Sequence, residues 1–254
     1  MSMASRAHPT PEPSSMRECR RVQGSRSRRC VCVSDMAGLS HHPVAPVHRR
    51  RRLGHWHDVP MSDAPLTGLV VLVDPAPLST LVGVVEVLVQ EGAANISLSA
   101  EDGALEPMLG MYGARTRIGC HGPLPDVMAA MGMGAQFLLP DDLDEPSARA
   151  ARERGVACYG MAMTPTEVRR ALELPVDGVQ LFPADVTGPL MADRLRSIGL
   201  IEHVIPRGGV VAYSAKQWLK AGAPAVCADS ALLADALTGG DLAALRERYR
   251  NYVG

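Results

Sequence analysis

Polar side chains that could do chemistry follow a series of short apolar runs within residues 61–254 of this 254-residue chain. Their types serve in proton transfer, nucleophilic attack and the binding of ions. The candidates are Asp74, Ser97, Ser99, His121, Asp141, Met163, Thr164, Gln180, Asp185, Arg207 and Ser230. Whether they can act together depends on the elements that carry them.

The apolar runs alternate with segments whose apolar residues recur at helical spacing. Strands are predicted at 69–73, 95–99, 115–119, 136–139, 156–160, 177–182, 203–205 and 225–228. Helices are predicted at 78–89, 102–111, 124–133, 145–154, 165–174, 189–198, 214–221 and 242–252, with a short helical turn at 230–236. Thr164 and Glu167 form a capping box around Pro165, and Asp241 caps the last helix.

Eight strand–helix units predict an α/β protein whose parallel sheet closes into a compact (β/α)8 TIM barrel. An open doubly wound sheet is the alternative. No G-x-G-x-x-G motif follows the first strand, which argues against dinucleotide binding. In a barrel the carboxyl ends of all strands meet at one face, so the candidate residues would surround a single site.

Two glycines in the loop after the seventh strand favour anion binding at that face. In Arg207-Gly208-Gly209 the glycines let backbone N–H groups approach an anion closely, and Arg207 adds a positive charge. The loops after the seventh and eighth strands, the latter containing Ser230, are a frequent phosphate site of this fold. An ordinary β-to-α turn is the alternative interpretation.

A metal site is less well supported by the spacing. His121, Asp141 and Asp185 lie at strand ends where they could converge on one cation, but their spacing is not diagnostic. We interpret His121 as a loop histidine, which is more often solvated than metal-bound. We therefore predict no metal and no other cofactor.

Charge is distributed unevenly along the chain, although its net charge is −1. Residues 1–60 contain 11 Arg, no Lys and 4 acidic residues (net +7), whereas residues 61–254 contain 15 basic and 23 acidic residues (net −8). The acidic second part argues against a nucleic-acid partner. The lack of an apolar run of about 18 residues argues against a membrane span.

Residues 1–60 are predicted to be a disordered basic tail rich in Pro and Arg, ahead of a barrel domain at 61–254. We interpret Arg49–Arg52 as a solvated charge run rather than a nucleic-acid or targeting signal. Met61 precedes the patterned sequence and is a candidate biological start, in which case the tail is not native. The tail has no apolar stretch of the kind that a secretory signal needs.

The six cysteines are dispersed along the chain. The three in the tail, with neighbouring His41 and His42, lack the spacing of a common structural zinc site. Isolated cysteines without a secretory signal are typical of a reducing cytoplasm and of proteins without a disulfide framework. The residues are Cys19, Cys30, Cys32, Cys120, Cys158 and Cys227.

Five motifs carry a family resemblance. Residues 177–185 read D-G-V-Q-L-F-P-A-D, 160–167 read G-M-A-M-T-P-T-E, and 205–210 read I-P-R-G-G-V; G-A-Q-F stands at 134–137 and A-G-A at 221–223. Matched in turn, they resemble D-G-V-K-L-F-P-A-E, G-V-A-T-P-S-E, M-P-T-G-G-V, G-A-Q-F and A-G-A of the 2-dehydro-3-deoxy-phosphogluconate / 4-hydroxy-2-oxoglutarate aldolases. These are the class I pyruvate aldolases. The resemblance spans residues 66–237, about two thirds of the chain.

The resemblance implies a (β/α)8 barrel that cleaves a carbon–carbon bond of a small 2-oxo acid or a phosphorylated sugar acid. It also implies a cytoplasmic homotrimer without a cofactor. Apolar candidates for the trimer contact are Leu139, Leu143, Met128, Met131 and Met133, although methionines at helical spacing more often belong to a core. By position in the motifs, the residues implied for substrate or phosphate binding are Thr164, Phe182, Pro183, Arg207, Gly208, Gly209 and Ser230.

The chain departs from the family pattern at the reacting groups. The family's Schiff-base Lys falls on Gln180, whose amide nitrogen cannot attack a ketone because it is delocalised into its carbonyl. The family's acid/base Glu falls on Ser97, which has no proton-transfer pKa near neutrality without a helper base. We therefore predict that imine-dependent cleavage is absent or very weak.

Further departures lie around the same pocket. The phosphate-loop Thr falls on Arg207, one family arginine falls near Val73 or Asp74 and another near Glu101, and the family's G-A-G-T becomes G-C-H-G at 119–122. Lys216 and Lys220 lie outside the barrel by periodicity, so a relocated Schiff base is improbable. Besides a lyase, the alternatives are a non-catalytic small-anion-binding barrel and a divergent enzyme, such as an isomerase using His121 or Asp185.

Overall fold

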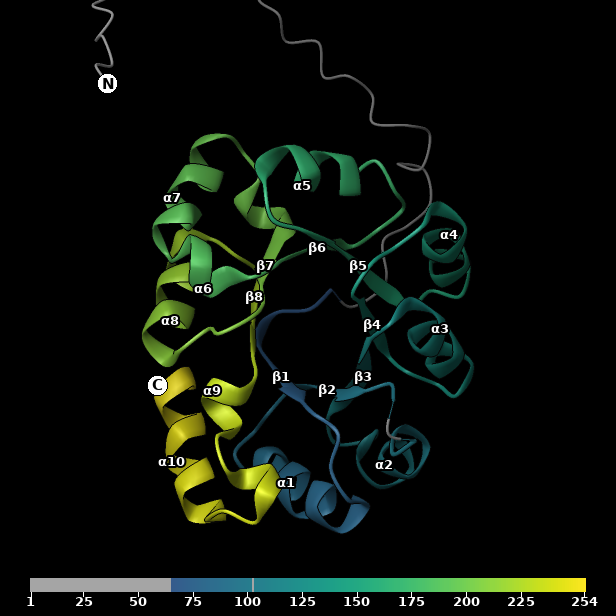
Figure 1. Ribbon diagram of the computed structural model, residues 1–254, viewed down its shortest axis with the longest axis vertical. Coiled ribbons are helices and arrows are strands. Elements are labelled where there is room, and N and C mark those ends of the chain that lie inside the picture. The colour runs from purple at the N-terminus through teal and green to yellow at the C-terminus, as the bar shows by residue number, and fades with distance from the viewer. Residues whose placement is uncertain (1–64, 102) are drawn as a thin grey trace, which may run out of the picture. The chain divides into compact units, whose positions relative to one another are not determined.

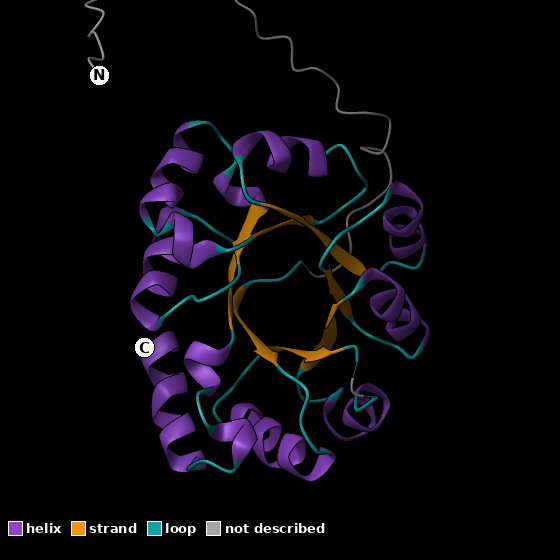
Figure 2. Cartoon of the chain, viewed as in Figure 1, coloured by secondary structure: helices purple, strands orange, loops and turns teal. Residues whose placement is uncertain are grey.

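Eight parallel strands form a nearly closed ring surrounded by helices, as Figures 1 and 2 show, so the predicted (β/α)8 barrel is confirmed. The computed structural model describes residues 65–101 and 103–254. The predictions for residues 1–60 and for Met61 lie outside these ranges.

The strands follow one another around the ring in the order of the chain. They are β1 (Gly68–Val73), β2 (Asn95–Ser99), β3 (Arg117–Gly122), β4 (Phe137–Pro140), β5 (Ala157–Ala162), β6 (Gly178–Leu181), β7 (Val204–Pro206) and β8 (Ala225–Ala228). Each pairs in parallel with its sequence neighbour from β1 to β7, and β1 also pairs with β8. β7 and β8 lie side by side, but the order of paired strands ends at these two. The ring is therefore closed in space, without a strand pairing between β7 and β8 among the described residues.

The connections run through helices on the outside of the ring. They are α1 (Leu78–Gln90), α2 (Leu105–Tyr112), α3 (Leu124–Gly132), α4 (Glu145–Glu153), α5 (Pro165–Ala171), α6 (Ala184–Thr187), α7 (Leu190–Ser197), α8 (Ala212–Ala221), α9 (Ser230–Leu233) and α10 (Leu242–Val253), with 3-10 helices η2 (Ile201–His203) and η3 (Ala236–Thr238). The capping box at Thr164 and Glu167 and the Asp241 cap are confirmed.

The third strand differs from its prediction, and the difference moves His121. The N–H groups of Arg115 and Thr116 donate to the carbonyl of Tyr112, so these residues belong to the turn after α2 instead of starting β3. The strand extends to Gly122 because it pairs with β2 on one side and β4 on the other. The placement of His121 on a solvated loop was therefore wrong: it lies in β3 and is only 6% exposed.

Alternate residues of each strand face the ring's interior, or lumen. Outward residues such as Val71, Ile96 and Cys120 pack against the helices. The inward set forms a separate apolar cluster of Leu66, Val70, Leu72, Phe137, Leu139, Ala157, Tyr159, Ile205, Ala225 and Cys227. Because the strand pleat repeats every two residues, the buried polar residues Ser97, His121 and Gln180 share the inward face.

Two sequence predictions about the molecular surface need correction. Leu139 and Met131 were candidates for a subunit contact, but both are buried, Leu139 in the lumen and Met131 on the buried face of α3. Among the described residues, Cys120, Cys158 and Cys227 are free and buried. No helix in residues 65–101 and 103–254 is long and apolar enough to cross a membrane.

Candidate functional site

The side chain of Gln180 lies fully buried in the lumen and uses its whole amide group. Its Nε2 donates to the carbonyls of Pro140 (2.8 Å) and Tyr159 (2.9 Å), and its Oε1 accepts from Nη1 of Arg207 (2.8 Å). An amide fits these partners because it offers two hydrogens to the carbonyls and an oxygen to the guanidinium. Gln180 thereby ties together β4, β5 and the loop after β7.

Arg207 stands at the mouth of the barrel, and its guanidinium is held on three sides. Besides Gln180, Nη1 donates to Oδ1 of Asp141 at 3.0 Å, and the guanidinium carbon lies 5.9 Å from the centre of the Phe182 ring. Its Nε and Nη2 have no hydrogen-bond partner within the described part of the chain. These two nitrogens can form the paired donor that a carboxylate accepts.

Ser97 and His121 form a hydrogen-bonded pair inside the barrel. They project from the paired strands β2 and β3, and Oγ of Ser97 lies 3.0 Å from Nδ1 of His121. Burial, and next the positive charge of Arg207, lower the pKa of His121 to about 3. The imidazole is therefore neutral at pH 7 and is too weak a base to accept protons efficiently there.

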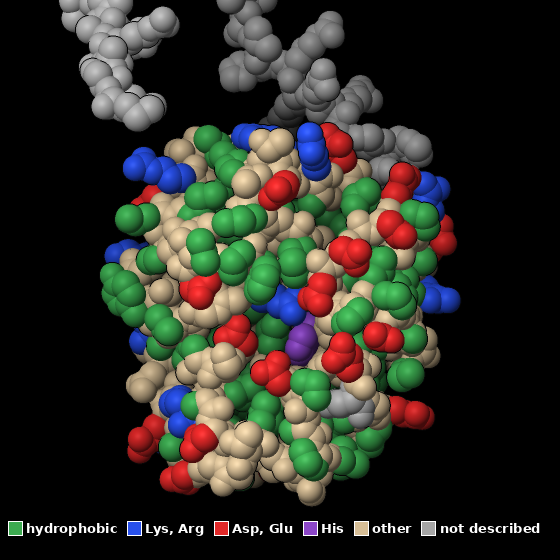
Figure 3. Space-filling view, in the orientation of Figure 1, with side chains coloured by type: hydrophobic (Ala, Val, Ile, Leu, Met, Phe, Trp, Pro, Cys, Tyr) green, Lys and Arg blue, Asp and Glu red, His purple; other side chains and the backbone are tan. Residues whose placement is uncertain are grey.

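Acidic side chains surround the mouth. Figure 3 shows this face with a histidine and basic side chains near its centre and several acidic side chains around them. Burial and the charge of Asp229 raise the pKa of Asp74, while Arg207 opposes them. Within residues 65–101 and 103–254, no group of three or more His, Cys, Asp or Glu is placed to hold a metal ion.

The glycine loop after β7 packs closely against its neighbours. Gly208 and Gly209 have φ values of +93° and +66°, which L side chains rarely adopt. A Cβ at Gly208 would lie 2.8 Å from the Phe182 ring, and one at Gly209 would lie 2.6 Å from a carboxylate oxygen of Asp185. The N–H of Gly209 donates to Oδ2 of Asp229 at 3.1 Å. This predicted phosphate donor is thus bonded to a carboxylate of the chain itself.

The structure brings some predicted site residues together and places others apart. Gln180, Arg207 and Asp141 form one hydrogen-bonded group, Ser97 and His121 form another, and the charge of Arg207 reaches His121. We call these five residues the Gln180 cluster. Of the others, Thr164, Ser230 and Met163 are exposed; Thr164 caps α5 and Ser230 begins α9. The hydroxyl of Ser99 accepts the N–H of Glu101. Pro183 follows a cis peptide bond from Phe182 and precedes α6.

Sequence reasoning missed three partners in the site. The carbonyls of Pro140 and Tyr159 could not be found, because every residue offers a carbonyl and only the fold selects these two. Asp229 carried a usable signal, since it stands directly before a predicted helical turn and a carboxylate there caps backbone N–H groups.

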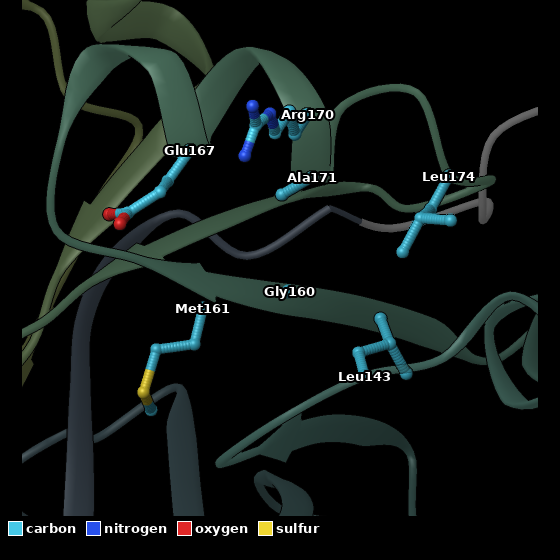
Figure 4. Close-up of a pocket in the computed structure, with 7 residues that line it drawn as sticks. All are labelled: Leu143, Gly160, Met161, Glu167, Arg170, Ala171 and Leu174. Atoms are coloured by element: carbon cyan, nitrogen blue, oxygen red, sulfur yellow. The ribbon is translucent and has the colours of Figure 1, made fainter.

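A hollow lies outside the lumen, between β5 and α5 (Figure 4). It has a volume of about 300 Å³ and is lined by Leu143, Gly160, Met161, Glu167, Arg170, Ala171 and Leu174. The carboxylate of Glu167 accepts the N–H groups of Met163 and Thr164, so it is already engaged in capping α5. No member of the Gln180 cluster lines this hollow.

One family model matches part of the chain. The model of the KDPG and KHG aldolase family matches residues 123–247. No curated protein sequence matches the chain.

Solved structures are similar over most of the barrel. One, described as the native KDPGal structure, is 20% identical with a TM-score of 0.66 and covers 76% of this chain and 96% of its own. A 4-hydroxy-2-oxoglutarate/2-dehydro-3-deoxyphosphogluconate aldolase from TTHB1 is 26% identical (TM-score 0.62; 72% and 92% covered). A KDPG aldolase from Legionella pneumophila, with pyruvate captured as a covalent carbinolamine, is 14% identical (TM-score 0.61; 72% and 92% covered).

Proposed function

Because the chain belongs to the KDPG and KHG aldolase family, we propose that its barrel binds a small, unphosphorylated 2-oxo acid without forming an imine with it. The supporting observation is the amide of Gln180, which occupies the lumen with three hydrogen bonds. The whole chain contains two lysines, Lys216 and Lys220, and both are exposed on α8. Neither lysine is therefore placed to attack a ketone inside the barrel.

Arg207 is the proposed carboxylate anchor. Gln180 and Asp141 hold Nη1, so the plane of the guanidinium is fixed before a ligand arrives. A guanidinium held in this way loses little conformational freedom when it binds a carboxylate through two parallel N–H bonds. The Legionella relative holds its pyruvate as a carbinolamine, whereas here the acid would be held by hydrogen bonds and charge alone.

The charges around Arg207 favour a monoanion over a phosphate ester. Asp229 already accepts the N–H of Gly209, and Asp74 lies close enough to both Asp229 and Arg207 to interact with their charges. A phosphate dianion meets about twice the Coulomb repulsion that a single carboxylate meets at the same place. We therefore place an unphosphorylated 2-oxo acid ahead of a phosphorylated sugar acid.

A divergent enzyme that uses His121 as a general base is the weaker alternative. With its pKa near 3, His121 has little proton affinity at neutral pH. As in the resemblance stated above, we propose that the barrel assembles as a homotrimer; the test of that assembly is argued below.

Reductive trapping tests the proposal directly. We expect no stable adduct on any lysine when the protein is treated with pyruvate and borohydride and its intact mass is measured. The double variant Gln180→Lys, Ser97→Glu is the positive control, because it returns the amine and the carboxyl of the family pattern to the lumen. Calorimetric titration with pyruvate should give binding to the wild type and none to Arg207→Met. A trapped adduct on Lys216 or Lys220 would show that imine chemistry survives elsewhere.

A further inference from the structure

We propose that His121 is a ligand-contacting residue whose Nε2–H donates a hydrogen bond to the 2-oxo oxygen of the bound acid, and that Ser97 is the positioning residue that fixes this tautomer. The inference rests on the proposed function, since it assumes a 2-oxo acid anchored at Arg207. It gives the Ser97–His121 pair a role that needs no proton transfer.

The tautomer follows from the surroundings of Ser97. Its side chain is fully buried, and within the described residues its hydroxyl has one hydrogen-bond partner, Nδ1 of His121. A buried hydroxyl hydrogen without an acceptor is costly, so Ser97 donates to Nδ1. Nδ1 must then be the unprotonated nitrogen, and a neutral imidazole carries its one proton on Nε2.

Nε2 is the part of His121 that remains for a ligand. The residue is only 6% exposed, and its Nδ1 is hydrogen-bonded to Ser97. Nε2 has no hydrogen-bond partner in residues 65–101 and 103–254, and it is not among their buried, unpaired polar atoms, so part of its surface stays accessible. His121 is the last residue but one of β3, at the end of the strand that faces the mouth.

His121 and Arg207 together offer the donors that a 2-oxo acid needs. The guanidinium lies close enough for its charge to disfavour protonation of the imidazole, and both residues stand at the carboxyl ends of their strands, β3 and β7. A 2-oxo acid carries its keto oxygen on the carbon next to its carboxylate. With the carboxylate on Nε and Nη2 of Arg207, an imidazole N–H from β3 can reach the keto oxygen. A matching acid without that oxygen can use Arg207 only.

Two variants of His121 separate the donor from the ring. The amide nitrogen of glutamine can stand near the place of Nε2, whereas the shorter asparagine reaches only the place of Nδ1. We expect pyruvate to bind the full chain about 5–10-fold more tightly than propionate in the wild type, with the preference retained in His121→Gln and reduced to about 1-fold in His121→Asn. Calorimetric titration measures the affinity of each of these three proteins for both acids, and Arg207→Met should bind neither acid.

The tautomer is measured independently of any ligand. In ¹⁵N-labelled protein, long-range imidazole correlations should show a proton on Nε2 of His121, assigned by its loss in His121→Asn. Ser97→Ala should give a mixture of tautomers, and Ser97→Thr, which keeps the hydroxyl, should restore the single form.

A proton on Nδ1 in wild-type protein that binds pyruvate, or an unchanged preference in His121→Asn, overturns the role of His121 alone. If neither acid binds the wild type, the proposed function is wrong, and the proposed hydrogen bond from His121 to the keto oxygen is wrong as well.

Discussion

At the scale of single residues, Gln180 contributes to stability as well as defining the pocket. In Gln180→Met the carbonyls of Pro140 and Tyr159 lose their donor and Arg207 loses an acceptor. Buried polar groups left unpaired cost about 1–3 kcal/mol each before relaxation, so we expect the free energy of unfolding to fall by about 2–4 kcal/mol. Urea denaturation measures it. Gln217→Met on α8, outside the barrel, is the matched control and should change by less than about 0.5 kcal/mol.

The buried imidazole of His121 makes stability depend on pH. Its folded pKa is about 3, against 6.5 in the unfolded chain, so the unfolded chain takes up the proton first as the pH falls. Stability is therefore lost between about pH 6.5 and pH 3, with a slope of up to about 1.4 kcal/mol per pH unit. Urea unfolding at pH 7, 6 and 5 of the wild type and His121→Asn isolates this contribution, because the carboxylates titrate in both. Parallel curves for the two proteins would show that His121 is not held neutral by the fold.

At the scale of elements, the loop after β7 depends on glycine for two separate reasons. Gly208 and Gly199 both have positive φ, but a Cβ at Gly199 meets nothing within 4 Å, whereas one at Gly208 lies 2.8 Å from the Phe182 ring. Gly199→Ala should therefore cost only the backbone strain, about 1 kcal/mol, and Gly208→Ala should cost more because Phe182 must move. Thermal melts compare the two. Equal melting temperatures would mean that the ring yields freely.

The elements were largely predictable because local patterns determine them. Strands β2 and β8 have their predicted bounds, and the capping box of α5 follows from Thr164 and Glu167 alone. The end of β3 was not predictable, because His121 enters the strand through pairing with β2 and β4. Such pairing is a tertiary effect that local propensity does not contain.

The candidate site was predictable in its residues but not in its contacts. Motif position put Gln180 and Ser97 at the pocket, and strand-end position added Arg207. The bond from Arg207 to Gln180 joins residues 27 positions apart, and the bond from Gly209 to Asp229 joins residues 20 apart. Only the closed ring brings these groups together. Because the N–H of Gly209 donates to Asp229, the group that the sequence predicted as a phosphate donor is already bonded within the chain.

At the scale of the whole molecule, exposed apolar side chains on α6, α7 and α8 offer the best surface for the proposed homotrimer. Val186, Leu190 and Tyr213 are 70%, 79% and 69% exposed. Leu190 and Tyr213 line one hollow between α7 and α8, which are neighbours in Figure 1. Apolar groups gathered in this way favour burial against another copy, at about 25 cal/mol per Å² removed from water.

Charge placed on this surface should separate the subunits. We expect the wild type to sediment as a trimer and Leu190→Arg to shift towards the monomer, because each contact would then have to bury an unpaired guanidinium. Met111→Arg is the matched control: Met111 is 45% exposed on α2, away from this surface, and the variant should remain trimeric. Analytical ultracentrifugation distinguishes the states, and circular dichroism checks that each variant is folded. A folded Leu190→Arg variant that stays trimeric would place the contact elsewhere, and a monomeric wild type would remove the trimer itself.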